Sequence, residues 1–423
     1  MLFLFYYCLK FLIHIVLKFR NMQKSMRTNL ILFIFLFISF AGKSVPLSNQ
    51  AELSLLTCSP GNEAYSVYGH TALRVRDELY KYDVVFNYGL FNFDTPNFVY
   101  RFARGETDYL LGAYEFSIFY DEYVVEKRSI YEQVLNLNQE EKQKIFEYLL
   151  WNARPENRIY RYNFFFDNCA TRIRDVVAQN TQGTVVFPDM PETPKTFRQL
   201  IKEYHSKLIW LNFGIDLVIS APADRIATVS EEMFLPDYLM KYFAEASVIS
   251  NEGTKPLVKQ SRIIFQAPEL SIKNMKATGP SVVFGLLALM ALLISIQQFR
   301  KGKITAWPDY FVYGLTGIMG IVMLWLAIFS EHPAMRPNYN LLWAIPLNLV
   351  FAVVWMVKKW RDKIKYYHLI ISCWLVLVVF VEFFLPQVFN PIHYFFILMV
   401  LSRSVTHFFF ILKRQDKTFS TKK

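Results

Sequence analysis

Residues 280–303 of this 423-residue chain read PSVVFGLLALMALLISIQQFRKGK, an apolar run that ends in basic residues. Four further apolar segments follow it, at residues 309–329, 340–357, 367–385 and 392–412. A helix of about 20 residues crosses the roughly 30 Å hydrocarbon core of a bilayer. The segments therefore predict that residues 279–423 form an all-α domain of five transmembrane helices.

The loops between these segments differ in charge, and the difference predicts their orientation. One set of loops and the C-terminal tail hold thirteen cations, namely Arg300, Lys301, Lys303, Lys358, Lys359, Arg361, Lys363, Lys365, Lys413, Arg414, Lys417, Lys422 and Lys423. The alternate loops, residues 330–338 and 386–391, hold only Arg336. Lys and Arg are retained on the cytoplasmic side of a membrane. Residue 279 is therefore expected outside the cytoplasm and the C-terminus inside it.

Residues 1–43 have the pattern of a leader. A first apolar stretch, residues 1–19, is interrupted by charged and polar side chains, whereas residues 30–41 form an apolar run after two basic residues. A basic start, an apolar run and a small-residue exit are typical of a secretory signal peptide. A retained N-terminal anchor is the alternative interpretation. Both interpretations export the domain that follows.

The composition agrees with a membrane protein. Apolar residues make up 53% of the chain and the mean hydropathy is +0.21, with the apolar excess at the two ends. A net charge of +11 would suggest nucleic acid in a soluble protein, but here the cations cluster beside the apolar segments. The sequence has no zinc or calcium spacing and no glycine-rich phosphate loop. Neither nucleic acid nor a metal or other cofactor is expected.

Residues 44–250 are expected to form an exported α+β domain, joined to the first span by a polar linker over residues 251–278. Two short segments, 71–75 and 80–85, read as strands. Capping and helix-start signals predict helices that begin at Asn138, Cys169 and Thr193-Pro194, with another over residues 231–246.

Two of the four cysteines lie in this domain. Cys58 and Cys169 are an even pair in an exported domain, so a structural disulfide is one interpretation. Cys8 and Cys373 lie in apolar segments and are expected to be packing residues. Cys169 differs from the others because it begins a helical pattern. The positive end of the helix macrodipole favours a thiolate there, which predicts a nucleophile.

The histidine suited to pair with this thiol is His70, which follows Gly69 at the start of a predicted strand. A Cys–His pair supports thiol acyl chemistry, because the imidazole takes the thiol proton and later protonates the leaving group. A third polar group normally orients the imidazole. Asp83 on the next predicted strand is expected in this role, with Asn87 as the second candidate. A lone histidine is more often structural, so this spacing is a weak signal by itself.

The order of a histidine on a strand and a cysteine at a helix start resembles the circularly permuted papain-like fold of NlpC-type hydrolases and lecithin–retinol acyltransferase-like enzymes. More closely, the chain from about residue 50 to its end resembles the Lnb family of bacterial lipoprotein N-acyltransferases. The motifs that carry this resemblance are LLTCSPG at 55–61, YGHTA at 68–72, FNYG at 86–89, DNCATR at 167–172, FGID at 213–216, MFLP at 233–236 and EHPAMRPNYNLL at 331–342. The combined set is specific, whereas each motif by itself is not.

The resemblance implies a cysteine-dependent acyltransferase of the bacterial inner membrane, with its thiol domain in the periplasm. Cys169 would attack an ester carbonyl of a membrane phospholipid or other glycerolipid and form a thioester. The α-amine of the lipid-modified N-terminal cysteine of a lipoprotein acceptor would then resolve it. His70 would serve as base and then as acid, and Asp83 would orient it.

Four further residues are candidates for substrate binding: Tyr65, Tyr68, Asn168 and Arg172. The two tyrosines could shape the acyl site or pack as aromatic core. Asn168 could cap the helix that Cys169 begins. Arg172 could meet a phosphate head group or lie on a solvated helix face. His332, in an exported loop, could join the site or be an ordinary interfacial residue.

Ionisable residues inside predicted spans are costly and often functional. Glu382 and Arg403 lie there, and they are expected to pair with each other or to extend toward the interface.

Two other functions fit the sequence: a membrane-tethered thiol hydrolase acting on peptidoglycan or lipid, and a scaffold braced by a Cys58–Cys169 disulfide. Five spans favour a lipid reaction, because a cell-wall peptidase needs at most one anchor.

Overall fold

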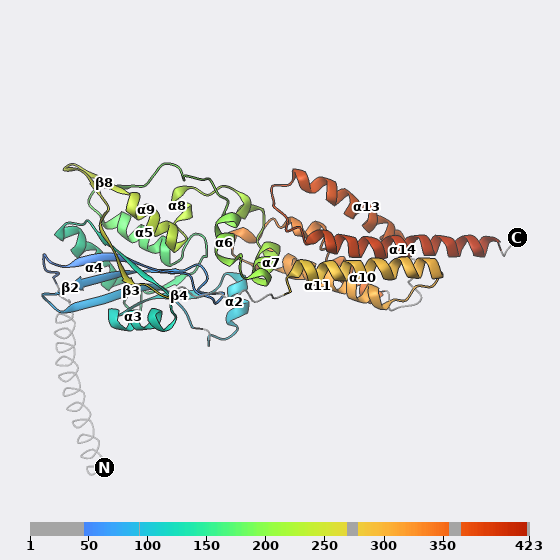
Figure 1. The fold of residues 1–423 in the computed structure, drawn as a ribbon, viewed down its shortest axis with the longest axis horizontal. Coiled ribbons are helices and arrows are strands. Elements are labelled where there is room, and N and C mark those ends of the chain that lie inside the picture. Colours follow the sequence, from blue (N-terminus) through green and yellow to red (C-terminus); the bar gives the residue numbers. More distant parts are fainter. Residues whose placement is uncertain (1–45, 93, 269–277, 355–364, 421–423) are drawn as a thin grey trace, which may run out of the picture. The chain divides into compact units, whose positions relative to one another are not determined.

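The computed structural model describes residues 46–92, 94–268, 278–354 and 365–420 (Figure 1). The leader predicted over residues 1–43, with Cys8, lies outside these ranges. Ser48–Lys423 forms one unit, in which an N-terminal α+β domain is followed by a C-terminal helical domain.

The N-terminal domain is built on a seven-stranded antiparallel sheet with the strand order β10-β5-β1-β2-β3-β4-β6. The strands are β1 (Glu52–Cys58), β2 (His70–Asp77), β3 (Tyr82–Leu90), β4 (Asp108–Glu115), β5 (Ile130–Leu135), β6 (Ile159–Arg161) and β10 (Val258–Phe265). β2 and β3 contain most of the two strands predicted at 71–75 and 80–85. The α+β class expected for this domain is confirmed.

The helices of this domain are α2 (Phe98–Arg104), α3 (Phe116–Val125), α4 (Gln139–Asn152), α5 (Cys169–Asn180), α6 (Phe197–His205), α7 (Ile209–Val218), α8 (Val229–Glu232) and α9 (Pro236–Glu245), with a 3-10 turn η1 (Ala221–Asp224). They cover both faces of the sheet, which explains why its central strands β1 and β2 are buried at almost every position. Val85 packs with Phe119 of α3 on one face. The neighbouring Phe86 points to the other face, where its ring lies 6.2 Å from that of Phe146 in α4.

Capping residues fix the helix starts close to where the sequence predicts them. Asn138 and Asn168 each form a capping box at the start of α4 and α5. The start predicted at Thr193-Pro194 is wrong by three residues, because Thr196 supplies the capping box of α6 instead. The helix predicted over residues 231–246 is two helices, since Pro236 starts a new one.

The segment predicted as a linker, residues 251–278, contains two strands instead. β9 (Gly253–Pro256) joins β7 (Thr184–Val186) and β8 (Ser247–Ser250) in a three-stranded sheet. β10 then pairs with β5 along the edge of the large sheet. An edge strand exposes much of its surface to solvent, so its polar composition looks like that of a linker.

The helical domain contains α10 (Pro280–Lys301), α11 (Trp307–Phe329), α12 (Leu347–Val354), α13 (Lys365–Val381) and α14 (His393–Ser420), together with the short 3-10 helices η2 (Pro333–Met335) and η3 (Tyr339–Leu342). In the described ranges, four helices are long and apolar enough to cross a membrane. The segment predicted as a fifth span over 340–357 is not one straight helix. Pro333–Leu342 and Leu347–Val354 are bent by 45°, so the domain has four spans, or five if this bent pair is one span.

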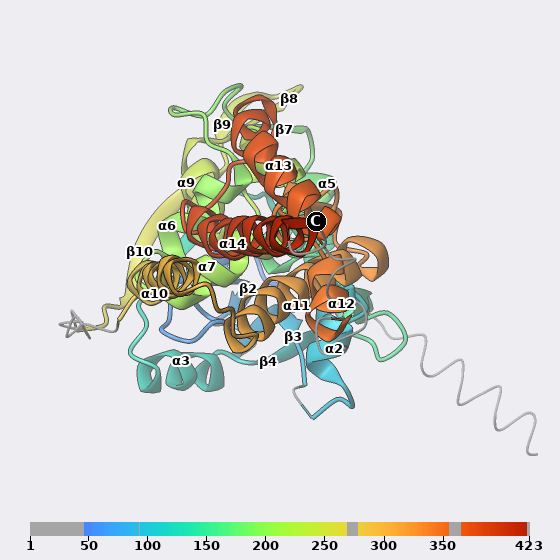
Figure 2. The same cartoon turned by 90° about the vertical axis from the view of Figure 1, so that its right-hand side faces the viewer.

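The long helices pack around α14, as Figure 2 shows in a view along that helix, with α10, α11 and α13 beside it. The bent pair packs against α11 through two glycines. A Cβ atom on Gly317 would lie 2.3 Å from the backbone nitrogen of Leu349, and one on Gly320 would lie 2.2 Å from the carbonyl oxygen of Ala344. Small residues allow helices in membranes to approach this closely.

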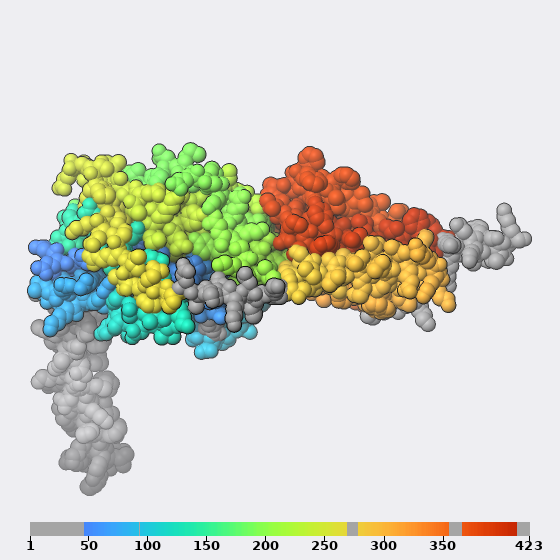
Figure 3. All heavy atoms as spheres, in the orientation of Figure 1, coloured from blue at the N-terminus to red at the C-terminus, as the bar shows by residue number. Residues whose placement is uncertain are grey.

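Partly buried hydrogen bonds join the two domains. Asn390, in the loop before α14, donates to the Asp216 carboxylate of α7 at 2.8 Å, and Asn338 donates to the carbonyl oxygen of Leu217 at 2.9 Å. Arg198 of α6 pairs with Asp216 and Asp224 from within the N-terminal domain. In Figure 3 the green atoms of this region lie against the yellow-orange and red atoms of the helical domain. The N-terminal domain is therefore attached to the helical domain by hydrogen bonds as well as by the polypeptide chain.

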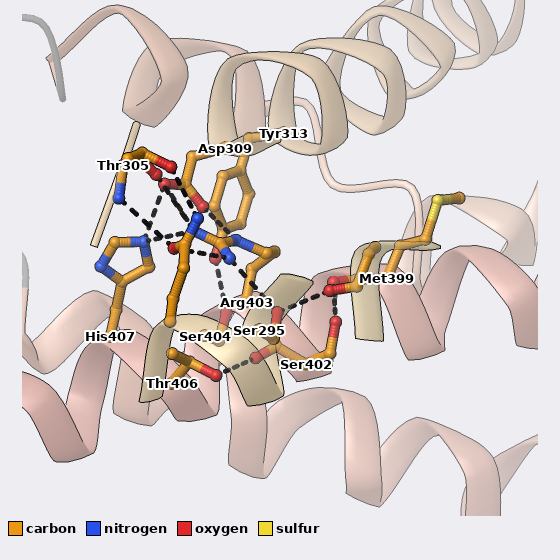
Figure 4. Close-up of polar contacts among 12 residues, drawn as sticks. Ser295, Thr305, Asp309, Tyr313, Met399, Ser402, Arg403, Ser404, Thr406 and His407 are labelled. Atoms are coloured by element: carbon orange, nitrogen blue, oxygen red, sulfur yellow. Dashed lines mark hydrogen bonds and ion pairs between the residues drawn. The ribbon is translucent and has the colours of Figure 1, made fainter. Parts of the chain in front are cut away.

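A buried polar cluster joins α10, α11 and α14 inside the helical domain (Figure 4). Arg403, fully buried, binds both carboxylate oxygens of Asp309, at 2.6 and 3.1 Å, and also the side-chain oxygen of Gln298. The expected pairing of Arg403 with Glu382 is therefore wrong. Glu382 lies in the 3-10 helix η5 (Glu382–Phe384), which precedes α14, and it binds His393 at the start of α14 at 2.7 Å.

Candidate active site

Cys169 is the first residue of α5, and Asn168 fixes its position. The Asn168 side-chain oxygen accepts hydrogen bonds from the backbone N–H groups of Ala170 and Thr171, at 2.9 and 3.0 Å. Its side-chain nitrogen donates to the carbonyl oxygens of Phe164 and Phe234. All these contacts are internal, so in this structure Asn168 caps and anchors the helix on which the thiol lies.

His70 is the first residue of β2, directly across from Cys58 in β1. Gly69 before it has a φ of +80°, and a Cβ atom there would lie 2.9 Å from the Cys58 carbonyl oxygen. Only glycine combines this backbone conformation with this close approach. The strand therefore starts with its histidine in a fixed place.

Asn87 orients the imidazole. Its side-chain oxygen lies 2.6 Å from Nε2 of His70, and its side-chain nitrogen donates to the Tyr114 hydroxyl at 2.6 Å. Because Asn87 presents an oxygen, Nε2 carries the imidazole proton and Nδ1 is left as the acceptor. Nδ1 is the nitrogen that can take a proton from a thiol.

Asp83 does not have the role predicted for it. Its two oxygens each accept a hydrogen bond at 2.7 Å from the Arg74 guanidinium. The register of β2 and β3 pairs Asp83 with Arg76, six residues along the strand from His70. At about 3.3 Å per residue, this offset is roughly 20 Å. Asn87, the second candidate, lies at the end of β3 that His70 faces.

Cys169, His70 and Tyr160 meet around Gly89. A Cβ atom on Gly89 would lie 3.6 Å from Cβ of Cys169, 3.7 Å from Cε1 of His70 and 3.9 Å from the Tyr160 hydroxyl. Gly89 has a φ of +93° and lies at a register irregularity between β3 and β4. The glycine of the FNYG motif therefore leaves open the space between the thiol, the imidazole and a phenol.

Tyr160 was not singled out from the sequence. Its side chain is only 7% exposed, and its hydroxyl has no hydrogen-bond partner among the described residues. Burial raises the pKa of this phenol, which therefore stays protonated. Tyr160 lies in β6, a strand of three residues, which is too short for a periodic pattern to reveal. A buried hydroxyl without a partner costs free energy and calls for an explanation.

The thiol and the imidazole are both neutral at neutral pH. Burial raises the pKa of Cys169 to about 11, although the backbone N–H groups of Thr71, Ala170 and Cys169 lower it by hydrogen bonding. Burial also lowers the pKa of His70 to about 4, and the hydrogen bond with Asn87 offsets only part of that effect. The thiolate expected from the helix macrodipole is therefore not the resting form, because desolvation outweighs the dipole.

Cys58 and Cys169 are both free cysteines, so the disulfide considered from the sequence is not formed in this structure. Cys58 is buried among the apolar residues between the sheet and α3. Burial raises its thiol pKa further, and Tyr123 hydrogen-bonds to it. Cys58 is thus placed as a core residue, while Cys169 is partly accessible. Cys373 lies exposed on α13.

The other predicted site residues are placed differently from one another. Tyr65 is 58% exposed and touches Phe91 edge-on, with ring centroids 6.3 Å apart. Tyr68 packs against Phe164 at 4.8 Å within an aromatic cluster. Arg172 pairs with Asp167 at 2.6 Å, and its guanidinium lies 3.8 Å from the centre of the Tyr160 ring. Arg172 therefore braces the site from within.

In the described part of the chain, there is no group of three or more His, Cys, Asp or Glu side chains that could hold a metal ion. The site consists of a thiol, an imidazole and hydrogen-bond donors. Together the fold and the site define a class: a membrane-anchored protein whose α+β domain places a cysteine at a helix start beside a histidine on a strand.

Comparison with known families identifies this class more closely. Residues 44–203 match the model of the Lnb N-terminal periplasmic domain, and residues 272–415 match the model of the Lnb transmembrane domain. The chain therefore belongs to the Lnb family, with a periplasmic N-terminal domain and a transmembrane C-terminal domain. Neither a curated protein nor a solved structure matched the chain.

Proposed function

We propose that this protein is a cysteine-dependent lipoprotein N-acyltransferase. It moves a fatty acyl chain from a membrane glycerolipid, through a thioester on Cys169, to the α-amine of a lipid-modified N-terminal cysteine. The Lnb domains support an acyltransferase role of this kind. The observation that carries the proposal is the convergence of the Cys169 thiol, the His70 imidazole and the Tyr160 hydroxyl around Gly89.

In the first half-reaction His70 Nδ1 takes the proton of the Cys169 thiol while the sulfur attacks the ester carbonyl of the lipid. The C–S bond forms and the carbonyl oxygen becomes an oxyanion. The intermediate then collapses, the C–O bond breaks, and the imidazolium returns its proton to the leaving oxygen of the lysolipid. The thioester remains on the enzyme.

In the second half-reaction the lipoprotein amine attacks the thioester. His70 takes a proton from the attacking nitrogen, the C–N bond forms and the C–S bond breaks. The proton then returns to the departing sulfur. The products are the N-acylated lipoprotein and the neutral Cys169–His70 pair from which the cycle started.

The neutral resting pair suits this chemistry. With a thiol pKa of about 11 and an imidazole pKa of about 4, thiolate is scarce unless a carbonyl carbon is in place to be attacked. Proton transfer is then coupled to formation of the C–S bond. A thiol that stays protonated between turnovers also resists oxidation, which matters in an oxidising compartment.

Two kinds of donor are available for the oxyanion. One is the backbone N–H of Cys169 at the start of α5, which already faces the sulfur. The other is the Tyr160 hydroxyl, which is protonated, buried and without a partner in the described structure. We assign Tyr160 as an oxyanion donor, because a substrate oxygen would supply the hydrogen bond that it lacks.

The same proposal includes the fold and the membrane topology. The His70 strand precedes the Cys169 helix, which supports a circularly permuted papain-like domain. The loops at Asn338 and Asn390 bind the periplasmic domain, which supports placing them at the outer face of the inner membrane and the C-terminus in the cytoplasm. The charge bias of the opposite loops points the same way.

The test is mass spectrometry of a lipoprotein N-terminal peptide from cells with and without this protein. We expect an added N-linked acyl chain in cells that contain the parent protein or the control Cys373→Ser, and none with Cys169→Ala or His70→Ala. N-acylation that persists with Cys169→Ala would contradict the proposal. Free fatty acid released without N-acylation would instead support a thiol hydrolase.

A further inference from the structure

The helix α2 exposes large apolar side chains to solvent. None of its seven residues is buried, and Val99, Tyr100 and Phe102 are 78%, 51% and 41% exposed. The two cations of this helix, Arg101 and Arg104, pair with Asp108 and Glu106. A contiguous exposed apolar surface of this kind marks an interaction site.

Hydrogen bonds hold α2 at the end of a membrane span. α11 ends at Phe329, and the residues that follow it bind the last carbonyl groups of α2. The Ser330 hydroxyl donates to the Ala103 carbonyl at 2.7 Å, and the Glu331 backbone N–H donates to the Arg104 carbonyl at 2.8 Å. The His332 Nε2–H donates to the Phe102 carbonyl at 2.8 Å. His332, considered from the sequence as a possible site residue, therefore binds α2 and not the catalytic centre.

One ring contact reaches into the span itself. The ring of Tyr100 lies 5.4 Å from that of Trp325, one turn before the end of α11. A tryptophan near the end of a span typically lies at the lipid head-group level. Because the periplasmic domain lies at this end of α11, these contacts place α2 beside the periplasmic end of the span.

A row of aromatic rings leads from α2 to the active site. Phe98 of α2 stacks on Phe91 at 5.5 Å, and Phe91 stacks on Tyr109 at 5.0 Å. Tyr109 in turn stacks on Tyr162 at 4.1 Å. Both tyrosines lie close enough to Cys169 to interact with it electrostatically. We call these four residues the aromatic row.

We propose that α2 inserts its exposed apolar side chains into the outer leaflet, and that the aromatic row guides one acyl chain of a glycerolipid from there to Cys169. The occupant is an acyl chain, because the row consists of aromatic side chains, begins at the exposed apolar helix and ends at the thiol that would attack the ester. Insertion of α2 stands on its contacts alone. The guiding role of the row rests on the proposed function.

Insertion is tested by photocrosslinking with the full-length protein. Val99 is replaced by p-benzoylphenylalanine, and the protein is reconstituted in vesicles of phosphatidylethanolamine and phosphatidylglycerol and irradiated. The control is the same replacement at Val125 of α3, which is 81% exposed on the same domain. We expect at least about tenfold more lipid adduct at position 99 than at position 125. Equal adduct at the two positions would overturn the insertion of α2.

The guiding role is tested by the rate at which Cys169 gains an acyl group from the same vesicles. We expect Val99→Asp and Phe91→Ala to slow it about tenfold, with Val125→Asp unchanged and with thermal unfolding of Val99→Asp and Val125→Asp close to the parent. Unchanged rates for Val99→Asp and Phe91→Ala would overturn the guiding role. A parent that never gains an acyl group while position 99 crosslinks to lipid would contradict the proposed function and leave the insertion of α2 standing.

Discussion

Nε2 of His70 lies 2.6 Å from the side-chain oxygen of Asn87, while Asp83 is bound to Arg74. The imidazole is thus oriented by a neutral amide. An amide oxygen fixes the tautomer without adding a negative charge that would raise the pKa of the histidine. The sequence alone presents Asp83 and Asn87, on the same strand, as alternative partners of His70, and the structure assigns the role to Asn87.

We therefore expect Asn87→Ala to lower kcat by about 10²-fold, because His70 loses the group that holds its tautomer and orientation. Asp83→Asn is the matched control, and it should leave kcat close to that of the parent. The measurement is the steady-state rate of N-acylation of a lipoprotein peptide. A large loss of kcat with Asp83→Asn and none with Asn87→Ala would reverse the assignment.

The pH dependence follows from the two shifted pKa values. His70 must be neutral to accept the thiol proton, so kcat/KM for the lipid donor should fall only as pH drops toward about 4 and should stay flat through neutrality. Folding stability should change in the same direction. The unfolded histidine binds a proton near its ordinary pKa of about 6.5 and the folded one does not, so stability falls as pH falls from about 6.5 to 4. A rise of kcat/KM for the lipid donor centred between pH 6 and 8 would instead indicate a resting thiolate–imidazolium ion pair.

Tyr160→Phe removes one hydroxyl and no other atom. If that hydroxyl binds the oxyanion, kcat should fall by about 10²- to 10³-fold. Stability should stay the same or rise by about 1 kcal/mol, because the hydroxyl has no partner among the described residues. Tyr88→Phe is the control, since that buried hydroxyl donates to Asn152 and its loss should reduce stability without a comparable loss of kcat. Full activity of Tyr160→Phe would exclude the oxyanion role.

The Arg403–Asp309 pair should stabilise the helical domain against loss of either partner. Removing one side of a buried ion pair leaves an uncompensated charge and costs about 3–5 kcal/mol, so Arg403→Ala and Asp309→Ala should each lower the unfolding temperature strongly. The double variant Arg403→Met, Asp309→Leu should lose less than the sum of the single changes. Thermal unfolding in detergent measures this, and additive losses would show that the two residues do not act as a pair.

The parts of the structure that follow local rules were predictable. Asn138 and Asn168 cap helices where their spacing indicates, and apolar length identifies four of the spans. The bend in the segment predicted over 340–357 was missed although Pro346, directly before α12, signals it, because proline ends or kinks a helix. The strand β10 was missed because its polar exposed positions resemble a linker.

The site was predictable only where a residue type already implies chemistry. Cys169 and His70 could be chosen because a thiol and an imidazole have few other roles together. Asp83 was chosen wrongly, because the choice required the strand register and the competing Arg74. The Cys169 pKa was also misjudged, since the helix dipole can be inferred from sequence but burial of the thiol cannot. Tyr160 needed the fold, because its only signal is a missing hydrogen-bond partner.

The most direct test of cysteine-dependent acyl transfer is the mass of the protein itself. The purified full-length protein is incubated with phospholipid vesicles and no acceptor, and Cys169 is then analysed by mass spectrometry. We predict a hydroxylamine-sensitive acyl adduct on Cys169 that disappears when a lipoprotein peptide is added, while the peptide gains the same mass on its α-amine. N-acylation of the peptide by a protein in which Cys169 has never carried an acyl group would contradict the thioester route.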